Sequence, residues 1–271
     1  MLTTRYLTGS PNWLDLATPD LSGAASFYGG LFGWTFRAAG PGAGGYGMFE
    51  LDGRTAAGGM TVPPEQGALG WTLYFQSASA DDTAERVRNL GGSVTYEPAD
   101  VWDLGRMAHF TDPAGVGFAT WQPRTNKGLD VVNETGSLCW AELWTPDPGA
   151  ALGFYRSVFG WDEFAVPVPG GDTYVTVNPA GAGEDAMFAG LVALETDPVE
   201  AAGGPYWLPY FEVTDTDATA AEAEELGGTV RTRPIDLEDV GRIAKLADPY
   251  GARFAVIETS VRSVGGAASA A

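Results

Sequence analysis

Cysteine and histidine are almost missing from this chain of 271 residues, because Cys139 and His109 are each the single residue of their type. One cysteine cannot form an internal disulfide, and one histidine cannot supply a histidine-rich metal site. Basic residues are also scarce: 15 Lys and Arg stand against 35 Asp and Glu, giving a formal net charge of −20. A phosphate backbone or an anionic bilayer would repel such a chain, which disfavours nucleic acid and membrane surfaces as partners.

Long apolar runs are missing as well. Residues 1–13 contain one arginine and no apolar run, so we expect neither a signal peptide nor a transmembrane helix, and a cytoplasmic location. The chain still has 45% hydrophobic and 12% aromatic residues, which is enough for packed cores, and its length suits two domains. Residues 265–271 contain only Gly, Ala and Ser, and we predict a flexible tail over 261–271.

An internal repeat organises the rest of the chain. Residues 13–34 align with 140–161 at an offset of 127, with 11 of 22 positions identical, and residues 91–121 align with 227–257 at an offset of 136, with 14 of 31 identical. The second copy is therefore nine residues longer (136 − 127), and the acidic stretch 196–204 is the expected place, because a loop lengthens at little free-energy cost. We predict domains over 9–123 and 137–260, joined by an exposed linker over 124–136.

The two copies share one order of predicted elements. Each begins with an alternating strand (13–18 and 140–145), an aspartate suited to an N-cap (Asp20 and Asp147), a helix, and a glycine stop (Gly33 and Gly160). After two or three short strands the pattern restarts with a strand (71–77 and 207–213), a helix that ends at a double glycine, and three strands. A unit of strand, helix and three strands is thus written four times, which predicts an α+β fold with mostly antiparallel sheets. The aromatic residues Phe27, Trp34, Phe154 and Trp161 are expected to be core.

Several short motifs recur in both copies in the same order. In the first copy they are Thr18-Pro19-Asp20, Phe27-Tyr28, Leu31-Phe32-Gly33-Trp34, Gly91-Gly92 and Asp112-Pro113-Ala114-Gly115. With these motifs the chain resembles the vicinal oxygen chelate superfamily over about residues 10 to 260; that superfamily includes glyoxalase I, bleomycin-resistance proteins and extradiol dioxygenases. It is similar in particular to two-domain actinobacterial members often labelled hydroxylase or glyoxalase-like. The resemblance implies four βαβββ modules that form two tandem domains, each curling its sheet into a cup around a ligand.

The resemblance also places the metal ligands of metal-using relatives. Those positions fall on Trp13, Thr72, Ala119 and the neighbourhood of Gly59-Met60 in the first copy, and on Trp140, Leu208, Ala255 and the neighbourhood of Ala189-Gly190 in the second. None of them is a carboxylate or an imidazole, whereas a divalent ion needs three or four converging N, O or S donors. We therefore expect no metal at the family position and no other cofactor.

Side chains alternate along a strand, so residues two positions from the lost ligands face the same cup. This selects Asp15 and Glu142 as candidate acid/base residues, with Glu212 as a partner of Glu142 if their strands adjoin. The candidate ligand-binding residues are Trp13, Tyr74, Gln76 and Trp121 in the first cup and Trp140, Tyr210 and Arg253 in the second. Asp15 and Glu142 have an alternative interpretation, in which they only accept backbone or Trp N–H bonds.

Other polar residues have structural interpretations. His109 is expected on a strand, facing solvent or capped by a neighbour, and Cys139 is expected to be a small buried residue. The segments 103–106 and 239–242 are expected to form turns with a local ion pair, although Arg106 and Arg242 could reach a ligand carboxylate instead.

Three functions compete at this point. The first is metal-free binding of a small hydrophobic or aromatic metabolite, in natural-product resistance or biosynthesis. The second is a metal-independent isomerase, cyclase or lyase that acts on a secondary metabolite through the cup carboxylates. Metal-dependent glyoxalase or dioxygenase chemistry is the least favoured, because the ligand positions are lost. Fused repeats can cover each other's sheet edges, so a monomer and a homodimer are both open.

Overall fold

The computed structural model describes residues 1–65, 67, 69–167 and 173–260, so the predicted tail over 261–271 lies outside the described residues. The first half of the chain contains β1 (Pro11–Thr18), α1 (Leu21–Phe32), β2 (Thr35–Ala38), β3 (Gly47–Leu51), β4 (Arg54–Thr61), β5 (Gly70–Gln76), α2 (Ala80–Asn89), β6 (Ser93–Val101), β7 (Gly105–Thr111) and β8 (Gly117–Pro123). The second half contains β9 (Leu138–Thr145), α3 (Pro148–Phe159), β10 (Asp162–Pro167), β11 (Thr173–Asn178), η1 (Glu184–Ala186), β12 (Ala189–Ala193), η2 (Leu194–Thr196), α4 (Pro198–Ala201), β13 (Tyr206–Glu212), α5 (Thr216–Glu225), β14 (Thr229–Leu237), β15 (Gly241–Ala247) and β16 (Arg253–Thr259).

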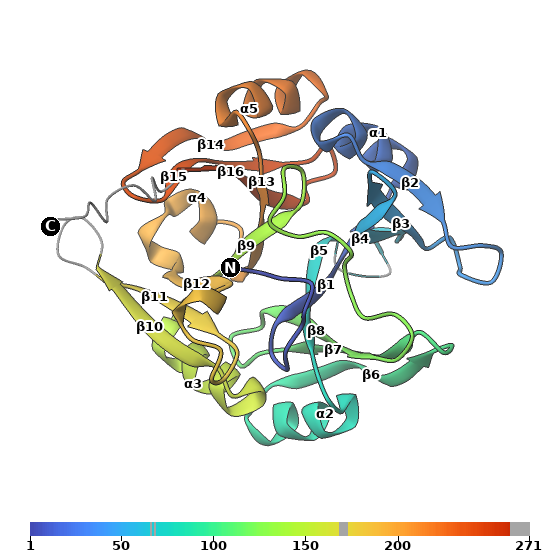
Figure 1. Ribbon diagram of the computed structural model, residues 1–271, viewed down its shortest axis with the longest axis vertical. Coiled ribbons are helices and arrows are strands. Elements are labelled where there is room, and N and C mark those ends of the chain that lie inside the picture. Colours follow the sequence, from blue (N-terminus) through green and yellow to red (C-terminus); the bar gives the residue numbers. More distant parts are fainter. Residues whose placement is uncertain (66, 68, 168–172, 261–271) are drawn as a thin grey trace, which may run out of the picture.

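The strands form two eight-stranded sheets with the same topology. The strand orders are β2-β3-β4-β1-β5-β8-β7-β6 and β10-β11-β12-β9-β13-β16-β15-β14. In each sheet two modules meet through an antiparallel pair, β1 with β5 in the first sheet and β9 with β13 in the second. Within each module the first and the last strand pair in parallel. The predicted unit of strand, helix and three strands is therefore confirmed four times over, and so is the α+β class (Figure 1).

Local sequence signals set the ends of the first helix of each repeat. Asp20 and Asp147 are extended N-caps whose side chains accept hydrogen bonds from the backbone N–H groups of Gly23 and Ala150. Gly33 and Gly160 end α1 and α3 with φ of 72° and 77°, a left-handed conformation that favours glycine. The predicted start and stop signals are confirmed at both helices.

The core of the molecule lies between the two halves. Helix α1 packs beside α5 and helix α2 beside α3, so each half contributes helices to both ends of the contact (Figure 1). The buried Tyr28 of α1 donates a hydrogen bond to Asp248 of the second half at 3.2 Å, and Tyr155 of α3 donates to Asp112 of the first half at 3.3 Å. The four aromatic residues expected in the core, Phe27, Trp34, Phe154 and Trp161, are all buried.

The connection over 124–137 contains no helix or strand, but it is not the exposed linker that its composition predicted. Leu129, Val131 and Val132 are buried, and Tyr6 of the N-terminal segment donates a hydrogen bond to the carbonyl of Leu129 at 2.9 Å. These few apolar side chains lie among polar and glycine residues, so the composition of the segment as a whole does not indicate that they are buried. The connection is part of the packed structure and runs past the open side of the first sheet (Figure 1).

The nine extra residues of the second repeat lie in more than one place. The single insertion expected at 196–204 is therefore wrong. The register pairs Asp15 with Gly58 and Glu142 with Gly190, so the offset has already grown to 132 (190 − 58) at this point. Five of the nine extra residues therefore precede Gly190, and four follow it, in the connection between β12 and β13. That connection is not a plain loop, because it folds into η2 and α4.

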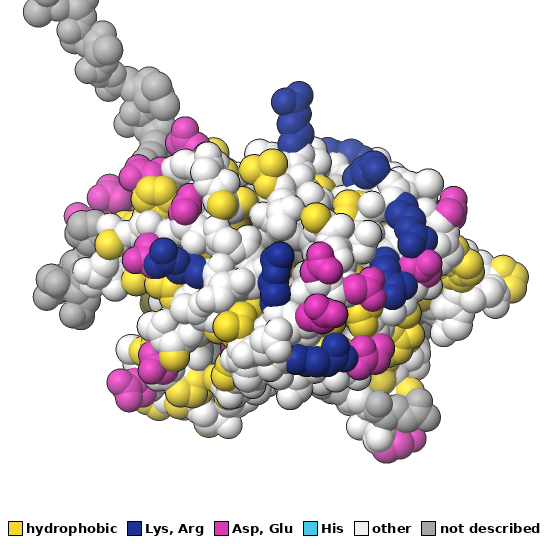
Figure 2. Space-filling view, turned by 90° about the horizontal axis from the view of Figure 1, so that it is seen from below, with side chains coloured by type: hydrophobic (Ala, Val, Ile, Leu, Met, Phe, Trp, Pro, Cys, Tyr) yellow, Lys and Arg dark blue, Asp and Glu magenta, His cyan; other side chains and the backbone are white. Residues whose placement is uncertain are grey.

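The surface carries mixed charges despite the excess of acid. Figure 2 shows a face on which basic and acidic side chains are interspersed. The turns at 103–106 and 239–242 are present, but the expected local ion pairs are wrong: Arg106 binds Asp81 and Asp100, and Arg242 binds Asp217 and Asp236. These partners come from the helix and the strand that precede each turn, which a four-residue motif cannot reveal. None of the described helices is long and apolar enough to cross a membrane.

Candidate functional site

The concave side of the first sheet, here called the first cup, holds a hydrogen-bonded network around Asp15. The Tyr74 hydroxyl donates to Asp15 Oδ2 at 2.8 Å, and the Tyr46 hydroxyl lies 3.5 Å from the same oxygen. The Trp13 indole N–H donates to the Tyr46 hydroxyl at 2.9 Å. Strand alternation explains the grouping, because Trp13 and Asp15 lie on the same side of β1 and β5 presents Tyr74 beside them.

Burial shifts the acid–base properties of this network. Removal from water raises the pKa of Asp15 to about 6, even though the bonds from Tyr74 and Tyr46 act in the opposite direction. Burial also lowers the pKa of His109, which keeps the imidazole neutral. His109 Nε2 lies 3.0 Å from the Tyr74 hydroxyl, so with Tyr74 donating to Asp15 the imidazole donates from Nε2. Asp15, Tyr74 and His109 thus form a continuous path for a proton.

A pocket of 410 Å³ opens beside the indole of Trp13. Its walls come from β1, β3 and β4, from the N-terminal segment and from the connection after β8. Trp13 also stacks on Trp121, with ring centroids 6.5 Å apart and planes inclined by 27°. The pocket lies in the size range of small-molecule sites, about 300 to 1,000 Å³. The N-terminal segment is anchored at this place by Gln76, whose amide donates to the carbonyl of Tyr6 at 2.9 Å.

The second cup repeats the network with glutamate in place of aspartate. Glu142 accepts hydrogen bonds from Tyr210 at 2.7 Å, Tyr174 at 3.0 Å and the Trp144 indole at 3.1 Å. The Trp140 indole donates to the Tyr174 hydroxyl at 3.2 Å, as Trp13 does to Tyr46. Burial raises the pKa of Glu142, while the three donors and the positive charge of Lys245 restrain the rise.

The second cup is occupied by the chain itself. Residues 195–203, here called the plug segment, include α4, which lies inside the curl of the second sheet (Figure 1). Glu200 is fully buried; it accepts a 2.7 Å bond from Arg231 and a further bond from the Tyr206 hydroxyl. In the first repeat, the described residues of the matching connection from Pro64 to Leu69 are exposed. The two cups therefore share a network but are covered by different segments: the N-terminal segment and the connection after β8 at the first cup, and the plug segment at the second.

The structure brings some of the sequence-predicted site residues together and separates others. Trp13, Asp15, Tyr74 and Trp121 lie together in the first cup, and Trp140, Glu142 and Tyr210 lie together in the second. Glu212 does not reach Glu142: the register places Leu208 opposite Glu142, and Glu212 lies four residues further on, about 13 Å along the strand. Glu212 instead accepts bonds from the backbone and hydroxyl of Thr259.

The remaining predicted residues have structural partners. Gln76 holds the N-terminal segment, and the Arg253 guanidinium lies 3.2 Å from the centre of the Tyr206 ring. The Cys139 thiol is partly buried, and it donates to the carbonyl of Tyr210. His109 is capped by a neighbour, Tyr74, which was one of its two expected environments.

Sequence reasoning missed five residues of the two networks: Tyr46, Tyr174, Lys245, Glu200 and Arg231. Tyr46 and Tyr174 had a usable signal, because each precedes or begins a strand at a matching place in the repeat. Neither residue lies on a first, fifth or last strand, which are the strands where alternation from the metal positions selects side chains. Glu200 and its partner Arg231 had no such signal, since nothing local shows that a glutamate of a loop enters the cup.

The residues at the family's metal positions do not fit a divalent ion. The eighth-strand positions Ala119 and Ala255 pair with Tyr74 and Tyr210, whose hydroxyls are already bonded to Asp15 and Glu142. In the first cup the available donors are one carboxylate and one imidazole, separated by Tyr74. Within the described residues, no group of three or more His, Cys, Asp and Glu side chains could hold a metal ion.

Comparisons with known proteins support the fold. The model of the Glyoxalase/Bleomycin resistance protein/Dioxygenase superfamily matches residues 10–120 and 137–256. Among solved structures, the 2,3-dioxygenase LapB from Pseudomonas sp. KL28 aligns with a TM-score of 0.62 at 16% identity over 93% of each chain. The Mn(II)-bound glyoxalase from Novosphingobium aromaticivorans aligns with a TM-score of 0.62 at 14% identity, over 93% of this chain and 83% of that one. At such identities the likeness concerns the fold alone.

Curated relatives are more similar in sequence. The anthracycline biosynthesis protein DauV from Streptomyces sp. (strain C5) is 41% identical over 270 residues, which covers 94% of this chain and 95% of the relative. The anthracycline biosynthesis protein DnrV from Streptomyces peucetius is also 41% identical, with the same coverage. The putative glyoxylase CFP32 from Mycobacterium bovis is 39% identical over 260 residues, which covers 94% of this chain and 97% of the relative.

Proposed function

Because this chain belongs to the Glyoxalase/Bleomycin resistance protein/Dioxygenase superfamily, we propose that it serves secondary metabolism by binding a small planar aromatic metabolite in the first cup without a metal ion. The observation that carries the proposal is the 410 Å³ pocket beside Trp13, on the same sheet face as the Asp15 network. An indole face stacks on a flat ligand, and the polar lining residues Thr55, Asn126 and Asp130 can orient a ligand hydroxyl or carbonyl. The two Streptomyces relatives named for anthracycline biosynthesis suggest a polycyclic aromatic ligand.

Metal independence rests on the chemistry of the donor positions. Trp13 occupies the first-strand ligand position, and its N–H is committed to Tyr46. An indole N–H is a donor only and cannot coordinate a cation through its nitrogen lone pair. We expect binding of the aromatic ligand to be the same in a chelating buffer and in one containing Mn²⁺, Fe²⁺ or Zn²⁺.

Ligand titration followed by calorimetry tests this proposal, with an anthracycline as the probe. Trp13→Leu removes the stacking surface, and we expect it to weaken binding about tenfold, equivalent to about 1.4 kcal/mol. Trp140→Leu is the matched control in the plugged cup and should leave the affinity unchanged. Equal losses in the two variants, or no binding by the unmodified protein to any polycyclic aromatic probe, would show that the first cup is not the site.

A second candidate function is metal-independent acid/base catalysis in the same cup. It is favoured by the pKa of Asp15, about 6, which lets the carboxyl exchange a proton near neutral pH, and by the path through Tyr74 to His109. Mass spectrometry of the released ligand separates the two functions, because only an enzyme returns an altered mass or an isomer with a different retention time. Asp15→Asn should then abolish turnover while binding persists, and Glu142→Gln should not affect it. Native mass spectrometry of the intact protein reports whether the chain is a monomer or a homodimer.

A further inference from the structure

The second cup contains positive charges that the first cup does not have. Arg231, Lys245 and Arg253 converge there, and at the offset of 136 their counterparts in the first repeat are Thr95, His109 and Gly117. The chain as a whole carries a net charge of −20, so three cations gathered within one partly closed cup run against the general composition. They mark a place suited to an anion.

The anion present is a carboxylate of the plug segment. Arg231 Nη1 contacts both oxygens of Glu200, at 3.0 and 2.7 Å, while Lys245 Nζ lies 3.9 Å and Arg253 Nη1 3.8 Å from it. Lys245 also binds Asp197 at 3.0 Å. Arg253 Nη1 is buried and has no hydrogen-bond partner among the described residues. Glu200 therefore fills the site without satisfying every donor in it.

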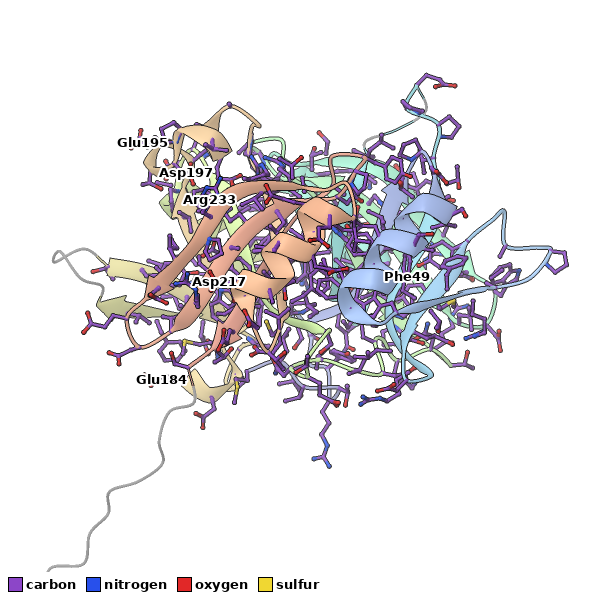
Figure 3. The ribbon with its side chains drawn as sticks, turned by 90° about the horizontal axis from the view of Figure 1, so that it is seen from above. Phe49, Glu184, Glu195, Asp197, Asp217 and Arg233 are labelled. Atoms are coloured by element: carbon purple, nitrogen blue, oxygen red, sulfur yellow. The ribbon has the colours of Figure 1, made fainter. Side chains whose placement is uncertain are left out.

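Little else holds the plug segment in place. Between Glu195 and Gly203 only Glu200 is buried and Asp197 partly buried, and the other side chains are exposed. Figure 3 labels Glu195 and Asp197 on this segment. Its attachment depends on the two carboxylates and on the carbonyl of Val199, which accepts a 3.2 Å bond from Arg231 Nη2, rather than on apolar contacts. A competing anion can replace the carboxylate contacts. Beneath the charges lie the buried apolar residues Trp144, Leu208, Ile243 and Ile257, beside the Glu142 network.

We propose that the second cup is a binding site for a small aromatic carboxylate, and that Glu200 occupies it as an internal competitor. The ligand carboxylate takes the place of Glu200 between Arg231 and Arg253, and its ring takes the apolar space next to Trp144, over whose ring Lys245 sits at 3.9 Å. A competitor tethered through a short segment acts at an effective concentration on the order of millimolar, so the unmodified protein binds an external carboxylate weakly. The site is independent of the ligand proposed for the first cup.

The experiment uses 1-naphthoate as the probe and the full chain. The double variant Asp197→Asn, Glu200→Gln keeps the shape of the plug segment and removes its charges. We expect it to bind 1-naphthoate at least tenfold more tightly than the unmodified protein, and to show faster hydrogen exchange over 195–203. Glu195→Gln, on the same segment but exposed, is the matched control and should change neither. Adding Arg231→Gln to the double variant should abolish the binding, whereas Trp13→Leu should have no effect on it.

Several results would overturn the proposal. One is a double variant that keeps its near-ultraviolet circular dichroism and opens the plug segment but binds 1-naphthoate no better than the unmodified protein. Another is inorganic phosphate binding as tightly as 1-naphthoate, which would exclude a role for the aromatic body. If the double variant does not fold, the unmodified protein provides the test. Saturating 1-naphthoate should then speed hydrogen exchange over 195–203, and unchanged exchange would contradict the displacement of Glu200 by the ligand.

Discussion

Replacing Asp15 with asparagine should stabilise this protein, even though the substitution alters the centre of its candidate site. The pKa of Asp15 is raised from 3.8 to about 6 by burial, so the folded protein holds the Asp15 proton more tightly than the unfolded chain does. The stabilisation that comes with protonation is complete below pH 3.8 and is lost as the pH rises through 6. Above that range the folded state contains a poorly solvated carboxylate.

The magnitude follows from the size of the shift. About 2.2 pKa units at about 1.36 kcal/mol per unit give at most about 3 kcal/mol at pH 8, and about half of that at pH 5. Asparagine retains an oxygen that accepts the 2.8 Å hydrogen bond from Tyr74, and it has no charge to desolvate. Asp15→Asn should therefore raise the free energy of unfolding by roughly 1–3 kcal/mol at pH 8 and by less at pH 5.

Guanidinium unfolding at pH 5 and pH 8 measures this difference. Glu142→Gln is the matched control from the second cup, where Lys245 and three hydrogen-bond donors already compensate the carboxylate, so its gain should be smaller. A loss of stability in Asp15→Asn at pH 8, or a gain that does not depend on pH, would refute the reasoning. A confirmed gain would indicate that Asp15 is retained for function at the expense of stability.

Two further predictions concern the packing of the repeats. Tyr28→Phe should lower the free energy of unfolding by about 1–3 kcal/mol, because it leaves Oδ2 of the buried Asp248 and the Trp71 N–H without their partner, and Tyr155→Phe should give a similar loss in urea unfolding. Gly153→Ala, in an open position within α3, should raise the melting temperature by up to about 3 °C, since alanine favours a helix by up to about 1 kcal/mol over glycine. Gly33→Ala should lower the melting temperature instead, because Gly33 has a φ of +72°.

The sequence predicted the fold well because its signals are local and are repeated. Asp20 and Gly33 set the ends of a helix through contacts within a few residues, and the second copy gives the same signals at Asp147 and Gly160. Strand alternation placed Trp13 and Asp15 on one face of β1, where the structure has them. The exposure predicted for the linker was wrong at Leu129 and Val131, because their burial depends on a surface that distant strands create.

The candidate site was predicted only in part, for a related reason. The pairing of Glu142 with Glu212 assumed that neighbouring strands bring their carboxylates together, but the register separates them along the strand. The role of His109 depended on Tyr74, which is 35 residues away in the chain. The path of the plug segment depended on Arg231 and Lys245, which come from strands that follow it.

By itself, then, the sequence determined the four modules, the caps and stops of the helices, and the strand face shared by Trp13 and Asp15. Each of these follows from residue type and spacing over a few positions, which fix backbone conformation and side-chain direction. Only the tertiary structure decided which segment covers each cup, which tyrosines bind the carboxylates and where the extra residues go. These depend on strand register and on burial between segments far apart in the chain, and through that burial the two networks acquire their shifted pKa values.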